Sequence, residues 1–309
     1  MPGTWGRPRG RPVPRAVLTS SGSVLFAKEF DSTSLRFPAR TVSIGGKGPA
    51  INSVRDMTGG GHGEPAVQPC LFILFPEGGR PSARDVRVAL ARGRMGQVSY
   101  DPAQSETVVV SSDWLELLVE GLTFDLLGLA PGRSLLAPVP RHCFGLSPAS
   151  LLGSEAIGLA PGPHLAGAAN APPVVRTLLR LASGLAWQWE AVLGTLWLPA
   201  ESAMGRGLFV SAIDAWLTGG PFPALGLTGV TERSGGVLAS DGLAFFTGQE
   251  LVLDAALSTD RIAATRLLVR LVDYLVEQPP LVGDRMIALE GGGRLQLAPA
   301  GSVIDVSPG

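Results

Sequence analysis

Cysteine and histidine are scarce in this sequence. It has only two cysteines, Cys70 and Cys143, and only three histidines. A disulfide framework or a zinc ribbon needs more thiols or a C-x-x-C pair, and neither pattern is present. His62, His142 and His164 do not pair with one another or with a cysteine at a metal-ligand spacing. We therefore expect no metal site and two free thiols in a reducing, cytoplasmic compartment.

Charge is also scarce, and lysine in particular. Charged residues make up 17% of the chain, compared with roughly 25% in an average soluble protein. The net charge of −1 implies no general attraction to nucleic acid, so no nucleic-acid partner is expected. Arginine greatly outnumbers the two lysines, and alanine, glycine and proline are abundant. This composition is typical of a GC-rich genome and indicates a bacterial source.

Long uncharged apolar runs are missing as well. A membrane-spanning helix needs about 18 or more consecutive apolar residues. The two best candidates, 115–130 and 178–198, are both interrupted by charged side chains. The first fifteen residues carry four arginines but no apolar core of a secretory signal. The sequence therefore predicts no membrane span and no signal peptide.

Motifs for nucleophilic catalysis and for phosphate binding are absent too. The sequence contains no G-x-S-x-G. Residues 45–48 read Gly–Gly–Lys–Gly, but they lack the first glycine, the Ser/Thr and the preceding strand of a phosphate loop. We expect no cofactor.

Glycine and proline, by contrast, are abundant, with 41 and 26 residues. Residues 1–66 contain eleven glycines and seven prolines without any sustained period, which predicts a disordered or non-core N-terminal extension. The α+β domain is expected over 67–309. It is either one unit or two subdomains, 67–131 and 164–309, joined by a connection rich in proline and glycine.

Three segments have the apolar period of amphipathic helices. In the first, Pro172 fits the first turn, and the apolar residues of one face follow at spacings of three and four over 174–185. The others are 207–217 and 260–277. In the last, one face is apolar and contains Leu271, while Arg270 lies on the polar face.

Short apolar runs between turn residues predict the strands. The segment 82–93, which begins at a capping serine, predicts one more helix. The end of the chain reads as a hairpin. The elements therefore favour an α+β fold with a largely antiparallel sheet and helices packed on one face. The predicted strands are 71–75, 107–110, 114–127 with a bend at Gly121, 192–198, 224–230, 243–246, 250–253, 286–289, 294–297 and 302–306. A helix is the alternative for 114–127.

Four carboxylates flank predicted strand ends, namely Glu190, Glu201, Asp241 and Glu250. Two of them could act as acid and base if the fold brought them together. The sequence contains no information on their distances. An enzyme that uses these carboxylates is therefore an alternative function, and solvated strand ends are the simpler interpretation.

Tryptophan is concentrated in one stretch. Trp187, Trp189 and Trp197 lie within eleven residues. The first two fall in a predicted connection, 186–191, where an extended chain would place both on one face. Tryptophan is enriched at binding hot spots, so Trp187 and Trp189 are the candidate partner-contact residues. The alternative is that both fold back onto the sheet as core residues.

The C-terminal part resembles an uncharacterised bacterial family catalogued as a domain of unknown function (4261-type). The resemblance rests on the helix 174–185 leading to Leu–Gly–Thr–Leu–Trp–Leu–Pro–Ala at 193–200, and on Gly–Leu–Ala–Phe–Phe–Thr–Gly–Gln–Glu–Leu at 242–251. The final long helix and the Pro-rich stretch 137–140 are also similar. The resemblance implies a cytoplasmic α+β domain that acts through interactions, with no catalytic residues to carry over.

Taken together, these features favour a non-enzymatic, macromolecule-binding or accessory module. We expect a protein partner or a homo-oligomer. The alternatives are an enzyme that uses the strand-end carboxylates and a structural subunit of an oligomer.

Overall fold

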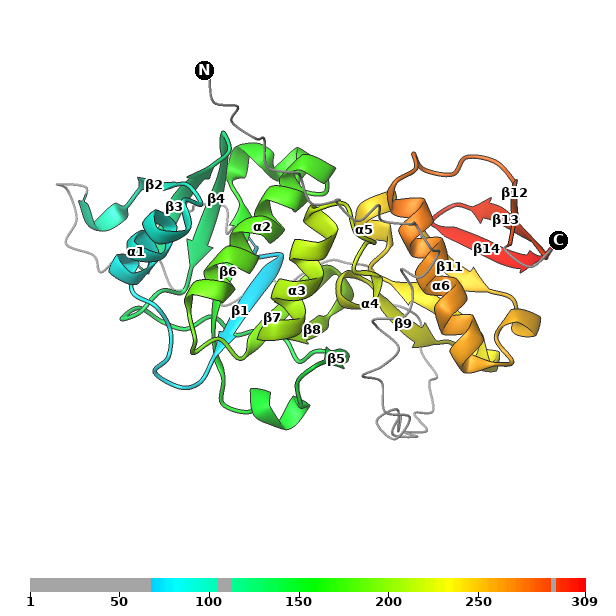
Figure 1. The fold of residues 1–309 in the computed structure, drawn as a ribbon, viewed down its shortest axis with the longest axis horizontal. Coiled ribbons are helices and arrows are strands. Elements are labelled where there is room, and N and C mark those ends of the chain that lie inside the picture. Colours follow the sequence, from blue (N-terminus) through cyan, green and yellow to red (C-terminus); the bar gives the residue numbers. More distant parts are fainter. Residues whose placement is uncertain (1–67, 105–112, 290–292) are drawn as a thin grey trace, which may run out of the picture. The chain divides into compact units, whose positions relative to one another are not determined.

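The computed structural model describes residues 68–104, 113–289 and 293–309 (Figure 1). These residues belong to one compact unit, Gly63–Gly309. The predicted extension 1–66 and the predicted strand 107–110 lie outside the described residues.

The described strands form two sheets. In the first sheet the order is β2-β3-β4-β6-β1-β7-β8-β5, and all neighbours are antiparallel except β5 and β8. Its strands are β1 (Leu71–Phe75), β2 (Gln97–Tyr100), β3 (Trp114–Val119), β4 (Leu122–Leu127), β5 (His142–Phe144), β6 (Glu155–Pro161), β7 (Gly194–Trp197) and β8 (Ser202–Gly205).

In the second sheet the order is β12-β13-β14-β11-β10-β9, and only β11 and β14 are parallel neighbours. Its strands are β9 (Gly229–Glu232), β10 (Leu238–Asp241), β11 (Glu250–Leu253), β12 (Arg285–Ala288), β13 (Arg294–Ala300) and β14 (Val303–Pro308). The predicted α+β class with largely antiparallel pairing is confirmed.

Helices α1 (Ala83–Gly93), α2 (Pro172–Gln188) and α3 (Arg206–Leu217) lie on one face of the first sheet, and α6 (Arg261–Val276) packs on the second sheet (Figure 1). Leu271 on α6 is buried, as its predicted face requires. The remaining helices are short. They are α4 (Ala224–Leu227) and α5 (Ala244–Thr247), with 3₁₀ turns at Pro102–Gln104, Pro148–Leu151, Pro163–Ala168, Leu198–Ala200, Ser234–Gly236 and Ala255–Leu257.

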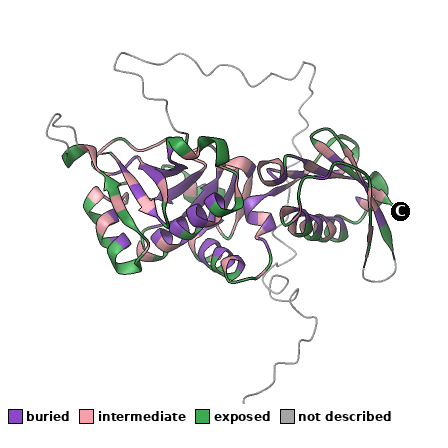
Figure 2. Ribbon diagram, turned by 90° about the horizontal axis from the view of Figure 1, so that it is seen from above, coloured by how far each residue is buried: buried purple, intermediate pink, exposed green. Residues whose placement is uncertain are grey.

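The middle of the first sheet is buried on both faces (Figure 2). Side chains alternate along a strand, so Leu71, Ile73 and Phe75 of β1 point to the helices and belong to the main core. Phe72 and Leu74 point the other way. They form a smaller apolar cluster that side chains of the connection between β4 and β6 cover. That connection therefore covers the face of the first sheet opposite the helices.

Strand β6 is absent from the strands that the sequence pattern predicts. It lies within the predicted Pro/Gly-rich connection between 131 and 164 and pairs with both β1 and β4, so part of that connection belongs to the middle of the first sheet. Gly158 is one reason why the sequence pattern does not predict this strand. A Cβ at this position would collide with the side chains of Pro69 and Leu135, so the strand needs a residue of low strand propensity at its centre.

Two predicted strands are wrong in part. Residues 243–246 fall largely in helix α5, and 224–230 begin with helix α4 before β9 starts at Gly229. A short apolar run does not distinguish a buried helix turn from a strand. For α5 the deciding contact lies outside the helix itself, because the Glu250 carboxylate, six to eight residues further along, accepts hydrogen bonds from the N–H groups of Gly242, Leu243 and Ala244.

The predicted strand 114–127 is a hairpin of β3 and β4. Glu120 and Gly121 form its two-residue turn, and both have positive φ, 51° and 82°. Two positive φ angles match the right-handed twist of the flanking strands. Arg180 on α2 contacts the Glu120 carboxylate at 2.6 Å and so holds the turn against the helix layer.

Candidate functional site

The four strand-end carboxylates occupy three different places. Glu201 and Asp241 converge on one arginine, Arg141. Glu250 caps the start of α5, and Glu190 lies in the connection between α2 and β7. The fold thus brings together two of the four residues.

Arg141 joins the two sheets. Its Nε lies 2.7 Å from Glu201 Oε2, beside β8 of the first sheet, and its Nη1 donates to Asp241 Oδ2 at 2.8 Å, at the end of β10 in the second sheet. All three side chains are partly exposed. The sequence carries no signal for this contact, because 100 residues separate Arg141 from Asp241.

His142 lies beside the same cluster. Its Nε2 is 3.8 Å from Asp241 Oδ2, and its ring packs so closely on Gly229 that a Cβ there would collide with it. The imidazole, and after it the Arg141 guanidinium, hold the pKa of Asp241 below its usual value, against the opposing effect of partial burial. A carboxylate with a lowered pKa is a weaker general base at neutral pH.

The lowered pKa of Asp241 predicts an acid-sensitive contribution to stability. The ionised carboxylate stabilises the fold above pH 3.8, the ordinary value, and this contribution is lost as the pH falls through the lower folded-state pKa. Asp241→Asn should lower the free energy of unfolding at pH 7 by about 0.5–1 kcal/mol, a size that allows for solvent screening.

Urea titrations of the wild type and the variant at a series of pH values measure this difference. It should shrink between about pH 4 and about pH 2. Glu77→Gln is the matched control, because the exposed Glu77 carboxylate makes no ion pair within the described residues. A difference between wild type and Asp241→Asn that does not change with pH would contradict the assignment.

Ser202 is a neighbour of His142 across the β5–β8 pairing. Its hydroxyl is buried and, like His142 Nε2, makes no hydrogen bond within the described part of the chain. An activated serine is bonded to its general base. Ser202, His142 and Asp241 are therefore not assembled as a nucleophilic site here, and the alternative of an enzyme that uses the strand-end carboxylates stays a hypothesis.

The two thiols are free, and their environments disfavour the thiolate form. Burial raises the pKa of Cys70 to about 12 and also raises the pKa of Cys143. His164 Nδ1 lies 3.4 Å from Thr123 Oγ1, and His62 lies outside the described residues. Within the described ranges, no three His, Cys, Asp or Glu side chains cluster as metal ligands.

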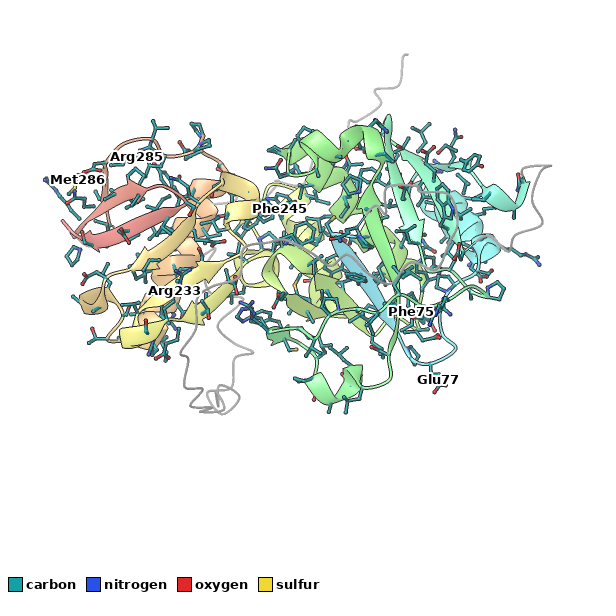
Figure 3. The ribbon with its side chains drawn as sticks, turned by 180° about the vertical axis from the view of Figure 1, so that it is seen from behind. Phe75, Glu77, Arg233, Phe245, Arg285 and Met286 are labelled. Carbon is teal, nitrogen blue, oxygen red and sulfur yellow. The ribbon has the colours of Figure 1, made fainter. Side chains whose placement is uncertain are left out.

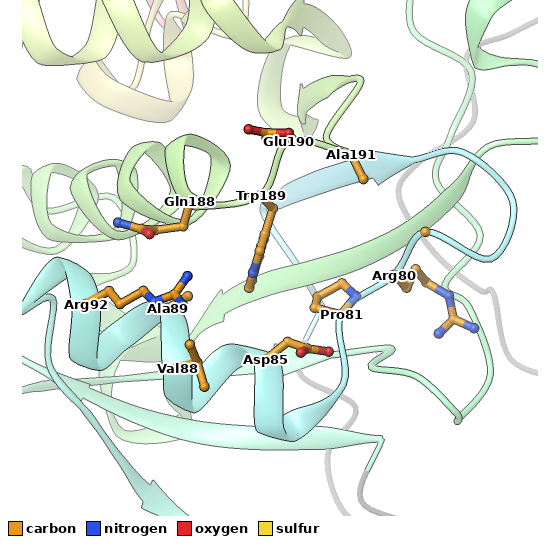
Figure 4. Close-up of a pocket in the computed structure, with 11 residues that line it drawn as sticks. Arg80, Pro81, Asp85, Val88, Ala89, Arg92, Gln188, Trp189, Glu190 and Ala191 are labelled. Carbon is orange, nitrogen blue, oxygen red and sulfur yellow. The ribbon is translucent and has the colours of Figure 1, made fainter.

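Trp189 lies in a groove of about 300 Å³ next to α1 (Figure 4). Its ring contacts Phe75 at 6.0 Å between centroids and reaches down toward the helix, where Val88 lies exposed. We call this surface the tryptophan groove. It is lined by Gly79, Arg80, Pro81, Asp85, Val88, Ala89, Arg92, Gln188, Trp189, Glu190 and Ala191.

Trp187 does not share a face with Trp189, as an extended segment would require. It belongs to the last turn of α2, and its side chain, 66% exposed, lies toward α3, with the Arg206 guanidinium 6.0 Å from its ring centroid. Arg206 also donates to the carbonyls of Ala186 and Trp187, which suits a cation at a helix C-terminus. The two tryptophans therefore mark neighbouring surfaces on either side of the end of α2.

No helix in the described ranges combines the length and the apolar character needed to cross a bilayer. Comparisons of the chain with protein-family models, with curated proteins and with solved structures find no match. The resemblance to the uncharacterised bacterial family therefore stays a prediction.

Proposed function

We propose that the protein is a non-enzymatic binding module whose tryptophan groove holds an extended segment of another protein. The observation that carries this proposal is Trp189, a large half-buried aromatic ring that lines a groove of about 300 Å³. Aromatic rings in partly formed pockets are the usual anchors of protein interfaces.

The polar lining of the groove supports an extended ligand. Arg92 and Gln188 line it, and within the described residues neither side chain makes a hydrogen bond or an ion pair. An extended peptide has main-chain carbonyls that such donors can bind. Beside these donors, Val88 and the Trp189 ring offer apolar contact to alternate side chains (Figure 4).

Trp187 is the second proposed contact. Two-thirds of its surface is exposed, which is unusual for a residue of this size. Trp187→Ser should therefore change the free energy of unfolding by no more than about 0.5 kcal/mol, while it weakens partner binding. Thermal unfolding and the binding assay described below check the two parts. Unchanged affinity would remove Trp187 from the contact surface.

Peptide display against the wild-type protein tests the groove. Extended apolar peptides should be recovered, and Val88→Glu should weaken their binding at least about tenfold, because it places a charge in the apolar part of the groove. Ile262→Glu is the matched control, since Ile262 is also a β-branched, exposed helical residue but lies on α6. Failure to recover peptides, or equal binding by both variants, would reject the proposal.

We also infer that the protein works in a reducing cytoplasm. Two free cysteines, one of them partly buried with its Sγ directed at the Leu159 carbonyl at 3.7 Å, support this location.

A further inference from the structure

One segment of the connection between β4 and β6 is exposed with a period of three. Arg133, Leu136 and Val139 are exposed, and the two residues between each pair are half-buried. Leu136 is 95% exposed and Val139 is 87% exposed, the extreme values for aliphatic side chains in this part of the chain. A period of three is the repeat of a polyproline II helix.

The sequence favours that conformation. Pro138 and Pro140 restrict their own φ angles and push Ala137 and Val139 toward extended conformations. Within the described residues, the main chain of 136–140 makes no hydrogen bond, as expected for polyproline II. We call residues 133–140 the proline ridge.

The inner side of the proline ridge fixes it to the sheet. Leu135 pairs with Ala156 as an isolated bridge, and the Ser134 hydroxyl accepts from the Ala156 N–H at 3.0 Å. Leu135 and Ala137 pack on the apolar cluster opposite the helices. The tryptophan groove lies on the helix side, next to α1. The two surfaces adjoin at one end, where Arg80 of the groove donates to the carbonyl of Gly132 at 2.9 Å. Leu135 and Ala137 hold the ridge on the opposite face, so it does not fill the groove of its own molecule.

We propose that the proline ridge of one molecule binds the tryptophan groove of a second molecule of the same chain. Proline-rich segments in this conformation dock in grooves lined by aromatic rings. The proposal rests on the proposed function of the groove and names its occupant. Because ridge and groove are different surfaces, the contact is head-to-tail and can continue from one copy to the next.

The dimensions of the two surfaces match. Leu136 and Val139 are one polyproline II turn apart, about 9 Å. On α1, Asp85, Val88 and Arg92 line the groove at spacings of three and four, and they span about 10 Å of helix. Two apolar side chains of the ridge can thus lie along the part of the groove that Val88 and Trp189 provide.

The charges and the hydrogen-bonding groups also complement one another. The carbonyls of 136–140 are available as acceptors, and Arg92 and Gln188 are available as donors. At the start of the ridge, Arg133 is exposed and forms no ion pair within the described residues. Asp85 in the groove uses one carboxylate oxygen, Oδ2, to cap α1 and can meet Arg133 with the other.

Sedimentation of the full chain tests the contact. The small groove implies a weak interface, so concentrations up to about 1 mM are needed. The mass of the wild type should rise with concentration above the 32.0 kDa of one chain. The ridge variant Leu136→Ser/Val139→Ser and the groove variant Val88→Glu should each stay monomeric. Both change only exposed side chains, so unchanged melting curves show that they fold.

Mixing the two variants gives the sharpest result. The ridge variant keeps an intact groove and the groove variant keeps an intact ridge. An equimolar mixture should therefore form a 1:1 complex and nothing larger. A wild type that stays monomeric, variants that still self-associate, or a mixture that stays monomeric would each overturn the proposal. Peptides that bind the groove in the display experiment would leave the proposed function standing even then.

The competing occupant of the groove is a four-residue motif that occurs twice in the chain. Pro–Val–Pro–Arg occurs at 138–141 and again at 12–15, in the N-terminal part of the chain. Val13→Ser is therefore the matched control for the ridge variant, and it should leave association unchanged. Loss of association in Val13→Ser, with association kept in the ridge variant, would assign the groove to residues 12–15 and overturn the proposal.

Discussion

Trp197→Ala should cause one of the largest losses of stability that a single substitution can produce in this protein. Trp197 is 1% exposed on β7. Removal of a fully buried aromatic side chain costs about 3–5 kcal/mol, because the apolar contacts are lost and a cavity remains. In a domain of this size, such a loss lowers the thermal midpoint by roughly 10 °C.

The contacts of the Trp197 ring explain why its removal should cost so much stability. Its ring lies 5.2 Å from the Phe245 ring in an edge-to-face arrangement, and 6.1 Å from the Phe246 ring. Both phenylalanines belong to α5, between β10 and β11 of the second sheet. Figure 3 shows Phe245 among closely packed side chains, whereas Met286 projects outward from β12. Trp197 therefore connects the cores of the two sheets.

Trp187→Ala is the matched control for Trp197→Ala. The same side chain is removed, but from an exposed position, so the free energy of unfolding should change by no more than about 0.5 kcal/mol. Urea unfolding of the two variants measures the comparison. Similar losses in both would show that Trp197 contributes little by its burial, and would contradict its role between the sheets.

The second large effect is expected for Gly242→Ala, in the turn from β10 to α5. Gly242 has φ of +90°, where a side chain is strained by about 1–3 kcal/mol. Its Cβ would also lie 2.7 Å from the Pro199 carbonyl oxygen and 2.8 Å from Ala200 Cβ. Such overpacking adds about 1–3 kcal/mol. The free energy of unfolding should therefore fall by roughly 2–6 kcal/mol.

Gly248→Ala separates these two contributions. Gly248 has a similar φ of +79°, but a Cβ there would meet nothing within 4 Å. Its variant should show the backbone strain without the overpacking, about 1–3 kcal/mol. Denaturant midpoints of both variants test the difference. If Gly248→Ala is as destabilising as Gly242→Ala, the contact with residues 199–200 does not matter.

Much of the helical structure follows from the sequence, because each long helix has its own amphipathic period. Over 172–188 and 261–276 the apolar spacing alone predicts the helix and its buried face. Strands with a continuous apolar run, such as β1, are equally clear. Short elements are not, because α5 depends on the Glu250 carboxylate, and β6 depends on pairing with strands on both sides.

The candidate sites also combine residues that the sequence indicates with residues that only the tertiary structure brings near them. The concentration of tryptophan at 187–189 is visible in the sequence, and Trp189 lines the groove. The other side of the groove comes from α1, about a hundred residues earlier, and no local pattern connects the two. Likewise, Glu201 and Asp241 could be named from the sequence, but Arg141, which joins them, could not.

By itself, the sequence determined the α+β class, the long helices with their buried faces, and the absence of a long uncharged apolar run. These properties depend on composition and on local periodicity, which a single segment carries. Only the tertiary structure decided the two sheets, the central place of β6, the meeting of Arg141 with two carboxylates, and the tryptophan groove and proline ridge. These features depend on contacts between segments far apart in the chain, and such contacts form only when the whole core is buried at once.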